Sequence, residues 1–253
     1  ESPDGISHVW APVTETPAVE RLQTALEGSV LLIADGHHRH ETARRFFARD
    51  SRCGSGRAMM AVVSEKDPGL VVLPTHRMVS PPAGGPRLTA AYLSRWVAEA
   101  YRGRLRTERV EQLESLPAGI LTGPKSSESR SGSIRLEAET PAPPAIYFYA
   151  AEEDGQHPRL FRITGDFAEL MSNLAGGKPV LWQCLPVAAL HLLVLDRLPV
   201  GSEIAYTHDA REAMRKVERG LAQVAFLLPP PPVSVIMELA KTGNLMPAKS
   251  TYF

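Results

Sequence analysis

A short aliphatic run that ends in a dense group of polar residues constrains this chain more than any other feature. The run is Ser29–Ala34, SVLLIA, and Asp35 and Gly36 follow it directly. Six aliphatic or small residues bounded by an Asp-Gly pair predict a buried strand. The residues from about His38 to Asp50 have the composition of a helix, so we expect a strand, a sharp turn and a helix in that order.

The residue types at this junction favour phosphate chemistry. Gly36 allows a sharp turn because it has no Cβ. The first N–H groups of the following helix are free to bind an anion, and Arg39 adds a planar cationic fork. His37 and His38 can donate to phosphate or transfer protons near neutral pH. Asp35 could orient a histidine, bind Mg²⁺ or accept a hydroxyl proton, so we assign catalytic roles to Asp35, His37 and His38 and phosphate binding to Gly36 and Arg39.

Other interpretations of the junction stay open. A histidine at a helix start is usually a cap or a surface residue, and an Asp-Gly pair taken alone is a turn. His37 and Glu41 are four residues apart and could share one helix face with His38 nearby, which would suit a transition metal. Adjacent histidines point in different directions, however, and no second ligand cluster is evident in the sequence.

Charge and composition narrow the function classes. The chain has 253 residues with 28 basic and 28 acidic side chains, a formal net charge of +0 and an isoelectric point near 7.3. A neutral chain offers no electrostatic footprint for a nucleic acid or a membrane surface, so we expect neither as a partner.

Cysteine use and apolar runs indicate the compartment. Cys53 and Cys184 stand in no CxxC pair, which favours a reducing environment without disulfides. The longest apolar stretch, Leu185–Leu195, is too short to span a bilayer, and the N-terminal residues lack the pattern of a signal peptide. We therefore expect the cytoplasm.

Strand-like and helix-like segments alternate along the chain, which predicts an α/β fold with a mixed sheet. A stretch rich in Pro and Gly follows Ser80 and suggests two sections, residues 1–80 and 81–253. The expected strands are Gly5–Val13, Ser29–Ala34, Arg57–Glu65, Gly69–Val79, Ala118–Gly123, Ser131–Glu139, Pro144–Glu152, Arg159–Thr164, Glu203–His208 and Ala222–Pro230. The expected helices are Thr16–Gly28, His38–Asp50, Leu88–Gly103, Leu181–Leu198, Asp209–Gly220 and Val233–Gly243.

Three segments together resemble the signature of the DUF1015 family. The run IADGHHRHETARRF is similar to the family's ADGHHRYETA-like element. VVLPTHRMV, Val71–Val79, resembles its LPTHR segment, and GNLMPAKSTYF, Gly243–Phe253, resembles its MPxKSTYFxPK segment near the C-terminus. The three segments are long and spread across the chain, so the resemblance is specific and covers nearly the whole sequence.

The resemblance adds phosphate-binding candidates to the junction: Thr75, His76, Arg77, Lys249, Ser250 and Thr251. Strand alternation places Thr75 and Arg77 on one face and His76 on the other. The Lys-Ser-Thr run echoes the end of a P-loop, but its glycines are missing, so we reject that motif. A strand end facing water and a solvated lysine remain the plain alternatives for these segments.

The DGHHR element is also similar to the phosphate-binding strand–turn–helix of the ParB/sulfiredoxin-like superfamily. That superfamily includes chromosome-partitioning nucleotide switches, sulfiredoxin and free-serine kinases. The resemblance implies a ParB/sulfiredoxin-like core in residues 1–80 and a larger mixed α/β section after it. In those kinases a Gly-His-His-Arg-like element is similar to residues 36–39, and the glutamate base lies upstream, where Glu15 and Glu20 stand in no recognisable motif.

These features predict a nucleotide-dependent phosphotransferase that acts on a small hydroxyl-bearing metabolite, in the manner of a serine kinase. The implied cofactors are ATP or ADP with Mg²⁺, and Asp35 is the candidate metal ligand. The expected partners are the nucleotide and a small-molecule acceptor, and the interpretation allows a homodimer. A nucleotide-binding switch without small-molecule chemistry and a phosphohydrolase are the alternatives.

Overall fold

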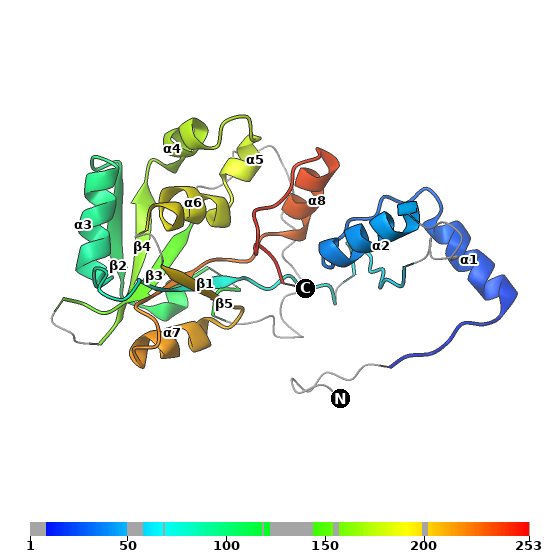
Figure 1. Cartoon of the computed structure of the whole chain (residues 1–253), viewed down its shortest axis with the longest axis horizontal. Coiled ribbons are helices and arrows are strands. Elements are labelled where there is room, and N and C mark those ends of the chain that lie inside the picture. Colours follow the sequence, from blue (N-terminus) through cyan, green and yellow to red (C-terminus); the bar gives the residue numbers. More distant parts are fainter. Residues whose placement is uncertain are drawn as a thin grey trace. The chain divides into compact units, whose positions relative to one another are not determined.

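The structure is a computed structural model that describes residues 9–49, 58–67, 69–117, 119–121, 144–153, 157–198 and 202–252. By its internal contacts the chain separates into two compact units, Glu1–Gly56 and Arg57–Phe253. Each unit is described here by itself (Figure 1). The sequence-based division after residue 80, with a ParB/sulfiredoxin-like core before it, stays a prediction.

The described part of the first unit contains two helices, α1 at Thr16–Leu26 and α2 at His37–Arg49, close to the predicted bounds. A proline near the start of α1 has the backbone angle that a first helical turn needs. Gly28, just after α1, has φ +75°, a conformation that glycine adopts without a steric penalty. Neither helix contains a buried residue.

The predicted strand at Ser29–Ala34 is wrong, because no residue of this segment has strand pairing in the structure. Val30 and Leu31 are 78% and 54% exposed. The predicted strand at Arg57–Glu65 is likewise absent from its described residues, where Met59 is fully exposed. Aliphatic composition gives a segment strand propensity, but a strand also needs a hydrogen-bonding partner, and the described chain supplies none here. The predicted strand Gly5–Val13 lies partly outside the described residues, and its described part is unpaired.

The second unit contains six strands and several helices within its described residues. The strands are β1 His76–Ser80, β2 Leu105–Val110, β3 Ile146–Ala150, β4 Arg159–Gly165, β5 Glu203–Thr207 and β6 Val224–Leu227. The α-helices are α3 Ala90–Ala100, α4 Phe167–Leu174, α5 Val180–Gln183, α6 Pro186–Leu193, α7 Ala210–Glu218 and α8 Val233–Lys241, with 3₁₀ turns η2 Leu113–Ser115 and η3 Leu195–Arg197.

The strands form one sheet in the order β2-β4-β3-β6-β1-β5, and each neighbouring pair is antiparallel. In Figure 1 α7 lies on one side of this sheet, while α4 and α6 lie on the other. This arrangement confirms the predicted mixed α/β class. β1 and β5 pair Arg77 with Tyr206 and His76 with Thr207, so the polar residues of the LPTHR segment lie beside the edge strand β5.

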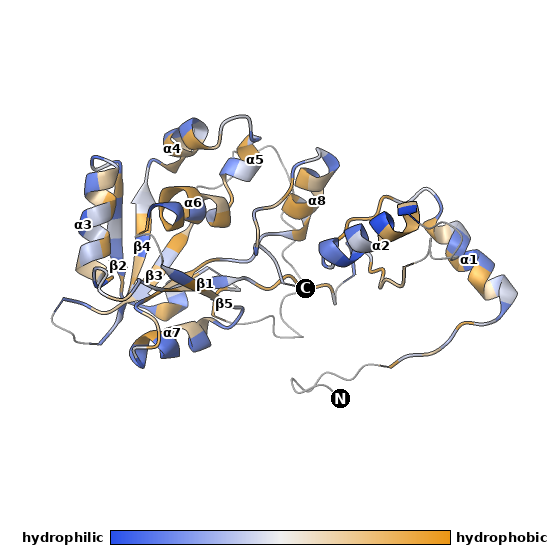
Figure 2. Ribbon diagram, in the orientation of Figure 1, coloured by the Kyte–Doolittle hydropathy of each residue, from blue (hydrophilic) through white to orange (hydrophobic). Residues whose placement is uncertain are grey.

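Two hydrophobic clusters cover the two faces of the sheet. Along β3, Phe148 belongs to the larger cluster with residues of α3, α4 and α6, while Tyr147 and Tyr149 belong to the smaller one with α7. The central strands β3 and β6 are therefore buried on both faces, and in Figure 2 orange, hydrophobic residues are seen on the sheet near β3 and on α6. Both faces of β1 are buried for the same reason, including its polar residues.

Three sequence predictions for the second unit need correction. The apolar stretch Leu181–Leu198 is not one helix, because Pro186 begins a new helix, α6, and α5 ends before it. Strand β2 was missed, since LRTERV is dominated by charged residues that suit an exposed edge strand. Predicted strands Ala118–Gly123 and Ser131–Glu139 lie largely or wholly outside the described residues.

Within the described residues, no helix has the length and apolar character needed to cross a membrane.

Candidate functional site

The start of α2 has the geometry of an anion-binding helix terminus. Gly36 has φ +82°, and its carbonyl oxygen accepts a hydrogen bond from the His40 N–H at 2.9 Å. Gly36 is therefore the residue at which the helix begins, and the N–H groups of His37, His38 and Arg39 have no acceptor among the described residues. Three backbone donors and the positive end of the helix dipole point to the same place.

Arg39 folds back over this turn. Its Nη2 lies 3.1 Å from Asp35 Oδ2, and a Cβ built on Gly36 would lie only 3.1 Å from the same nitrogen. The positive φ favours glycine at position 36, and a Cβ there would also make the guanidinium shift by a few tenths of an ångström. The two charged side chains are 82% and 84% exposed, so the ion pair is weak and can exchange for another anion.

The two predicted catalytic histidines lie on the surface. His37 and His38 are exposed, and neither side chain has a hydrogen bond in the described structure. Both imidazoles are therefore free to contact a ligand at the start of α2.

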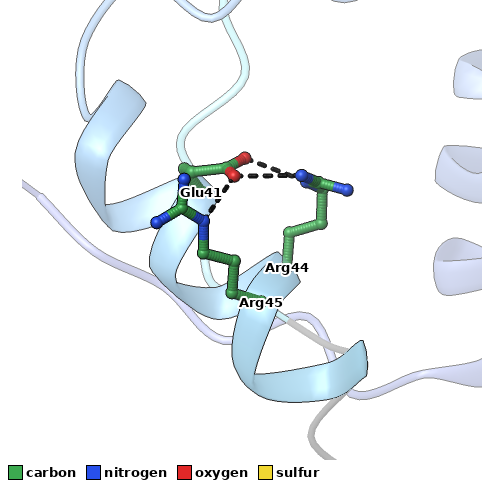
Figure 3. A network of polar contacts seen from close by, with 3 residues as sticks. All are labelled: Glu41, Arg44 and Arg45. Atoms are coloured by element: carbon green, nitrogen blue, oxygen red, sulfur yellow. Dashed lines mark hydrogen bonds and ion pairs between the residues drawn. The ribbon is translucent and has the colours of Figure 1, made fainter. Parts of the chain in front are cut away.

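One turn further along α2, Glu41 is held by two arginines (Figure 3). Arg44 donates to both carboxylate oxygens at 2.9 Å, and Arg45 Nε donates to Oε1 at 2.8 Å. These hydrogen bonds, first from Arg44 and then from Arg45, lower the pKa of Glu41 to about 2. Because the arginines occupy the carboxylate, Glu41 is a poor partner for His37 in a metal site, and the described residues hold no cluster of three metal-ligating groups.

In the second unit, His76 and Arg77 lie on opposite faces of β1, in line with strand alternation. His76 is fully buried on the face that Met78 shares with α7, and its Nδ1 accepts a hydrogen bond from the Leu228 N–H at 3.3 Å. Burial lowers the pKa of His76 to about 4. An acceptor Nδ1 and a depressed pKa together describe a neutral imidazole.

Arg77 is also fully buried, on the other face of β1. It donates to the carbonyl oxygen of Thr75 and, through Nη2 at 2.7 Å, to that of Lys249. Its guanidinium lies over the Tyr206 ring, 5.7 Å from the centroid, and Nε has no partner in the described structure. Burial lowers the pKa of Arg77 to about 10, so the group stays cationic at neutral pH without a paired carboxylate among the described residues.

The C-terminal segment Lys249–Tyr252 lies beside Arg77 and Leu73, and these residues form one corner of the second unit. Lys249 adopts φ +55°, and the Ser250 hydroxyl donates to the Pro247 carbonyl, which closes a tight turn. An antiparallel bridge then joins Tyr252 to Leu73. The LPTHR and KSTYF segments are therefore adjacent in the second unit. Lys249 is exposed, Thr251 and Thr75 are half-buried, and Ser250 is buried.

The sequence did not single out the aromatic side chains beside this corner. Tyr252 stacks on His208 with ring centroids 4.9 Å apart and an interplanar angle of 16°. Tyr206 covers Arg77 from β5. In the sequence, Tyr206 stands two residues before His208, and Tyr252 lies in the KSTYF segment. The sequence does not show that these residues lie close together, because this depends on contacts between segments far apart in the chain.

A small hollow of about 230 Å³ lies elsewhere on the second unit, lined by Ala90, Ala91, Ser94, Glu152, Glu153 and Phe161. None of the predicted site residues lines it. Its two glutamates would repel a phosphate, so it does not suit the predicted ligand.

Comparison with a family model supports the motif-based resemblance. Residues 1–118 match the model of a family described as "Protein of unknown function (DUF1015)". The match includes the DGHHR and LPTHR elements and confirms the predicted resemblance over that part of the chain. No curated protein matches the chain.

Solved structures provide distant similarities. A mutant of free serine kinase in complex with AMP is 14% identical with a TM-score of 0.45, covering 95% of this chain and 80% of that one. A conserved hypothetical protein from Pyrococcus furiosus is 16% identical with a TM-score of 0.44, covering 93% and 80%. Free serine kinase in complex with AMP is 17% identical with a TM-score of 0.40, covering 95% and 80%.

Proposed function

We propose that this protein is a nucleotide-dependent phosphotransferase that acts on the hydroxyl group of a small metabolite, with serine as the first acceptor to test. The phosphates of ATP or ADP bind at the start of α2. The cytoplasm is the proposed compartment, and a homodimer is compatible with the proposal.

The geometry at the start of α2 is the observation that supports this proposal. Three unpaired backbone N–H groups, a glycine with φ +82° and a guanidinium folded over that glycine converge on one exposed point. A phosphate there would accept from the backbone donors and from Arg39 in two parallel hydrogen bonds. Because the Asp35–Arg39 ion pair is exposed, its exchange for a phosphate costs little.

Asp35 fits the role of a Mg²⁺ ligand. Its carboxylate is exposed beside the proposed phosphate position. A phosphate bound by Arg39 would replace Asp35 in the ion pair and leave this carboxylate free to bind the metal ion. Mg²⁺ in nucleotide sites is commonly held by one or two carboxylates, the phosphates and water, so one aspartate is a sufficient protein contribution. When bound, the ion would neutralise charge on the transferring group. His37 and His38, both exposed, would donate to the phosphate or move a proton.

In the second unit we assign different roles to the LPTHR and KSTYF residues. Lys249 is exposed, so its ammonium group is accessible and it stays a proposed phosphate ligand of the second unit. Arg77 is buried and holds the backbone at Lys249 and Thr75, which makes it a positioning residue. His76 is neutral and buried on the opposite face, so it supports β1. The hydroxyl groups of Thr251 and Thr75 are half-buried and remain proposed phosphate ligands, while Ser250 closes the turn.

Isothermal titration tests the phosphate site. ATP, ADP, CTP and pyrophosphate are titrated with Mg²⁺ into the wild type, into Arg39→Ala and into the control Arg49→Ala at the other end of α2. Loss of a charge-assisted bidentate contact should weaken binding by roughly 1.5–3 kcal/mol in Arg39→Ala alone. Equal affinities in all three proteins, or no binding to the wild type, would exclude the proposed site.

Turnover then distinguishes the reaction classes. Release of ADP from ATP only in the presence of serine or another alcohol indicates a phosphotransferase. Phosphate release without an acceptor indicates a hydrolase, and saturable binding without turnover indicates a nucleotide switch.

A further inference from the structure

Two exposed aromatic rings, His208 and Tyr252, stack where β5 ends, and a third, Tyr206, lies two residues earlier on β5. Tyr206 and Tyr252 are 41% and 54% exposed, and His208 is also exposed. Tyr252 and His208 are already stacked in parallel, with centroids 4.9 Å apart. One face of the Tyr252 ring is covered by His208, and its remaining exposed surface offers a flat aromatic area that a planar ligand could extend.

Positive charge accompanies these rings. The buried guanidinium of Arg77 lies 5.7 Å from the Tyr206 ring centroid, with Nε unpartnered in the described structure. The exposed Lys249 is three residues before Tyr252, and its ammonium group has neither an ion pair nor a hydrogen bond among the described residues. Arg77 Nη2 donates to the carbonyl oxygen of Lys249 at 2.7 Å, which holds the backbone of the lysine in a defined position.

Two acidic residues close to His208, Glu212 and Asp209, are already engaged. Glu212 accepts from the Thr207 hydroxyl at 2.5 Å and pairs with Lys216 at 3.0 Å. Asp209 follows His208 and caps α7, accepting from the Arg211 N–H at 2.8 Å, and its other oxygen lies 3.5 Å from Arg215. Its charge is therefore balanced within α7. The corner as a whole presents aromatic surface beside an uncompensated cation, a combination that suits a flat neutral ring with an anionic tail.

From this arrangement we propose that Tyr252, His208 and Tyr206 form the base-binding surface of a purine nucleotide, whose phosphate contacts Lys249. The proposal rests on the proposed function in its ligand class, a nucleotide, and it concerns the second unit by itself. The purine continues the His208–Tyr252 stack on the open side of Tyr252. Stacking discriminates weakly between bases, and a purine is favoured by its larger ring area.

Ligand-observed proton NMR tests the stacking directly, using adenosine, ADP and tripolyphosphate with the full chain. Stacking on an aromatic ring shifts the adenine H8 and H2 signals upfield, and a purely structural residue would not cause this. We expect the shifts with the wild type, with Tyr252→Phe and with Arg39→Ala, and their loss with Tyr252→Leu. Base–aromatic stacking is worth about 1–3 kcal/mol, so Tyr252→Leu should weaken adenosine binding by roughly 5- to 150-fold.

Lys249→Met, with Lys241→Met at the end of α8 as its control, separates the phosphate contact from the stack. We expect Lys249→Met to weaken ADP binding about tenfold while the adenosine shifts persist. His208→Leu is the second stacking variant, and circular dichroism verifies that each variant is folded.

The outcomes separate this inference from the proposed function. If Tyr252→Leu and His208→Leu both keep the adenine shifts, or the wild type never produces them, the inference is wrong, whatever Arg39→Ala does to tripolyphosphate. If Arg39→Ala binds tripolyphosphate normally while Tyr252→Leu loses the adenine shifts, the result supports the base-binding surface and excludes the phosphate site at the start of α2. A polyadenylate that binds far more tightly than ADP would assign the surface to a nucleic acid and overturn the nucleotide proposal.

Discussion

Arg77 and Lys249 are 172 residues apart in the chain, yet Arg77 Nη2 lies 2.7 Å from the Lys249 carbonyl oxygen. The guanidinium is fully buried and also donates to the Thr75 carbonyl. It therefore ties the turn that carries Lys249 to β1. Within the described residues this buried cation is held by hydrogen bonds to carbonyls and not by an ion pair, and its Nε has no partner.

Replacing Arg77 should loosen the C-terminal segment. In Arg77→Met the carbonyls of Thr75 and Lys249 lose their charged donor, so we expect the free energy of unfolding to fall by about 1–3 kcal/mol. The Leu73 N–H, which donates to the Tyr252 carbonyl at 2.8 Å, should exchange with deuterium faster. Urea unfolding and hydrogen exchange measure the two effects. The exposed Arg219→Met is the control, and unchanged exchange at Leu73 in Arg77→Met would contradict the role of Arg77 as an anchor.

His76 should make stability depend on pH. Burial, the largest effect, lowers its folded-state pKa from 6.5 to about 4, and a nearby backbone group of Ile120 opposes this shift. The unfolded chain therefore binds a proton that the folded chain excludes between these values. The stabilisation from a neutral His76 is complete above about pH 6.5 and is lost as the pH falls toward 4, by on the order of 3 kcal/mol.

Urea unfolding between pH 7.5 and 4 measures this contribution in the wild type and in His76→Asn. Asparagine keeps an acceptor for the Leu228 N–H but cannot titrate. The variant should be less stable at pH 7.5, and the difference from the wild type should shrink as the pH falls. A constant difference across the range would mean that His76 does not titrate with a depressed pKa.

The helices and central strands of the second unit were predictable because local patterns and tertiary packing agree there. α7 has a capping aspartate, Asp209, and apolar residues at helical spacing, which suffice to predict it. β3 and β6 are short apolar runs of the type that a sheet buried on both faces requires. In contrast, the charged edge strand β2 resembles a loop in sequence, and the antiparallel pairing of all neighbours follows from long-range contacts.

The candidate site was predictable in its residue types and less so in its geometry. Gly36 at a helix start follows from local sequence, since the turn chemistry is local. The burial of His76 and Arg77 could not be predicted, because it depends on β5 and β6 pairing on either side of β1. The strand predicted around Val30 was wrong for a different reason. Its aliphatic side chain suits a strand, but no described segment pairs with it and it is exposed.

Removing Arg44 should raise the pKa of Glu41. Arg44 contributes the largest share of the shift to about 2, and Arg45 the next, so Arg44→Met should raise the pKa more than Arg45→Met. Because the folded-state pKa is depressed, the contribution of these contacts to α2 is present above about pH 4.5 and is lost as the pH falls toward 2. Carboxyl-carbon NMR titration measures the pKa, with Arg49→Met as the control on the same helix. A Glu41 pKa near 4.5 in the wild type would exclude the double contact.

Gly36→Ala separates the backbone requirement of the turn from the contact with Arg39. A non-glycine residue at φ +82° costs about 1–2 kcal/mol, and the same strain applies to Gly28→Ala at φ +75°. Only at position 36 does the new Cβ meet a side chain, since it would lie 3.1 Å from Arg39 Nη2 and 3.2 Å from Nε, whereas nothing lies within 4 Å at Gly28. Gly28→Ala is therefore a matched control.

Both variants should lower the helical stability of the first unit to a similar extent, as measured by circular dichroism during thermal unfolding. Pyrophosphate affinity should fall several-fold only in Gly36→Ala, because the guanidinium of Arg39 must shift away from the new Cβ and leaves its position over the helix start. If the two variants bind pyrophosphate equally well, the close packing of Arg39 on Gly36 has no part in anion binding. Affinity lost in both would instead mean that binding depends on the stability of the helices and not on the geometry of the turn.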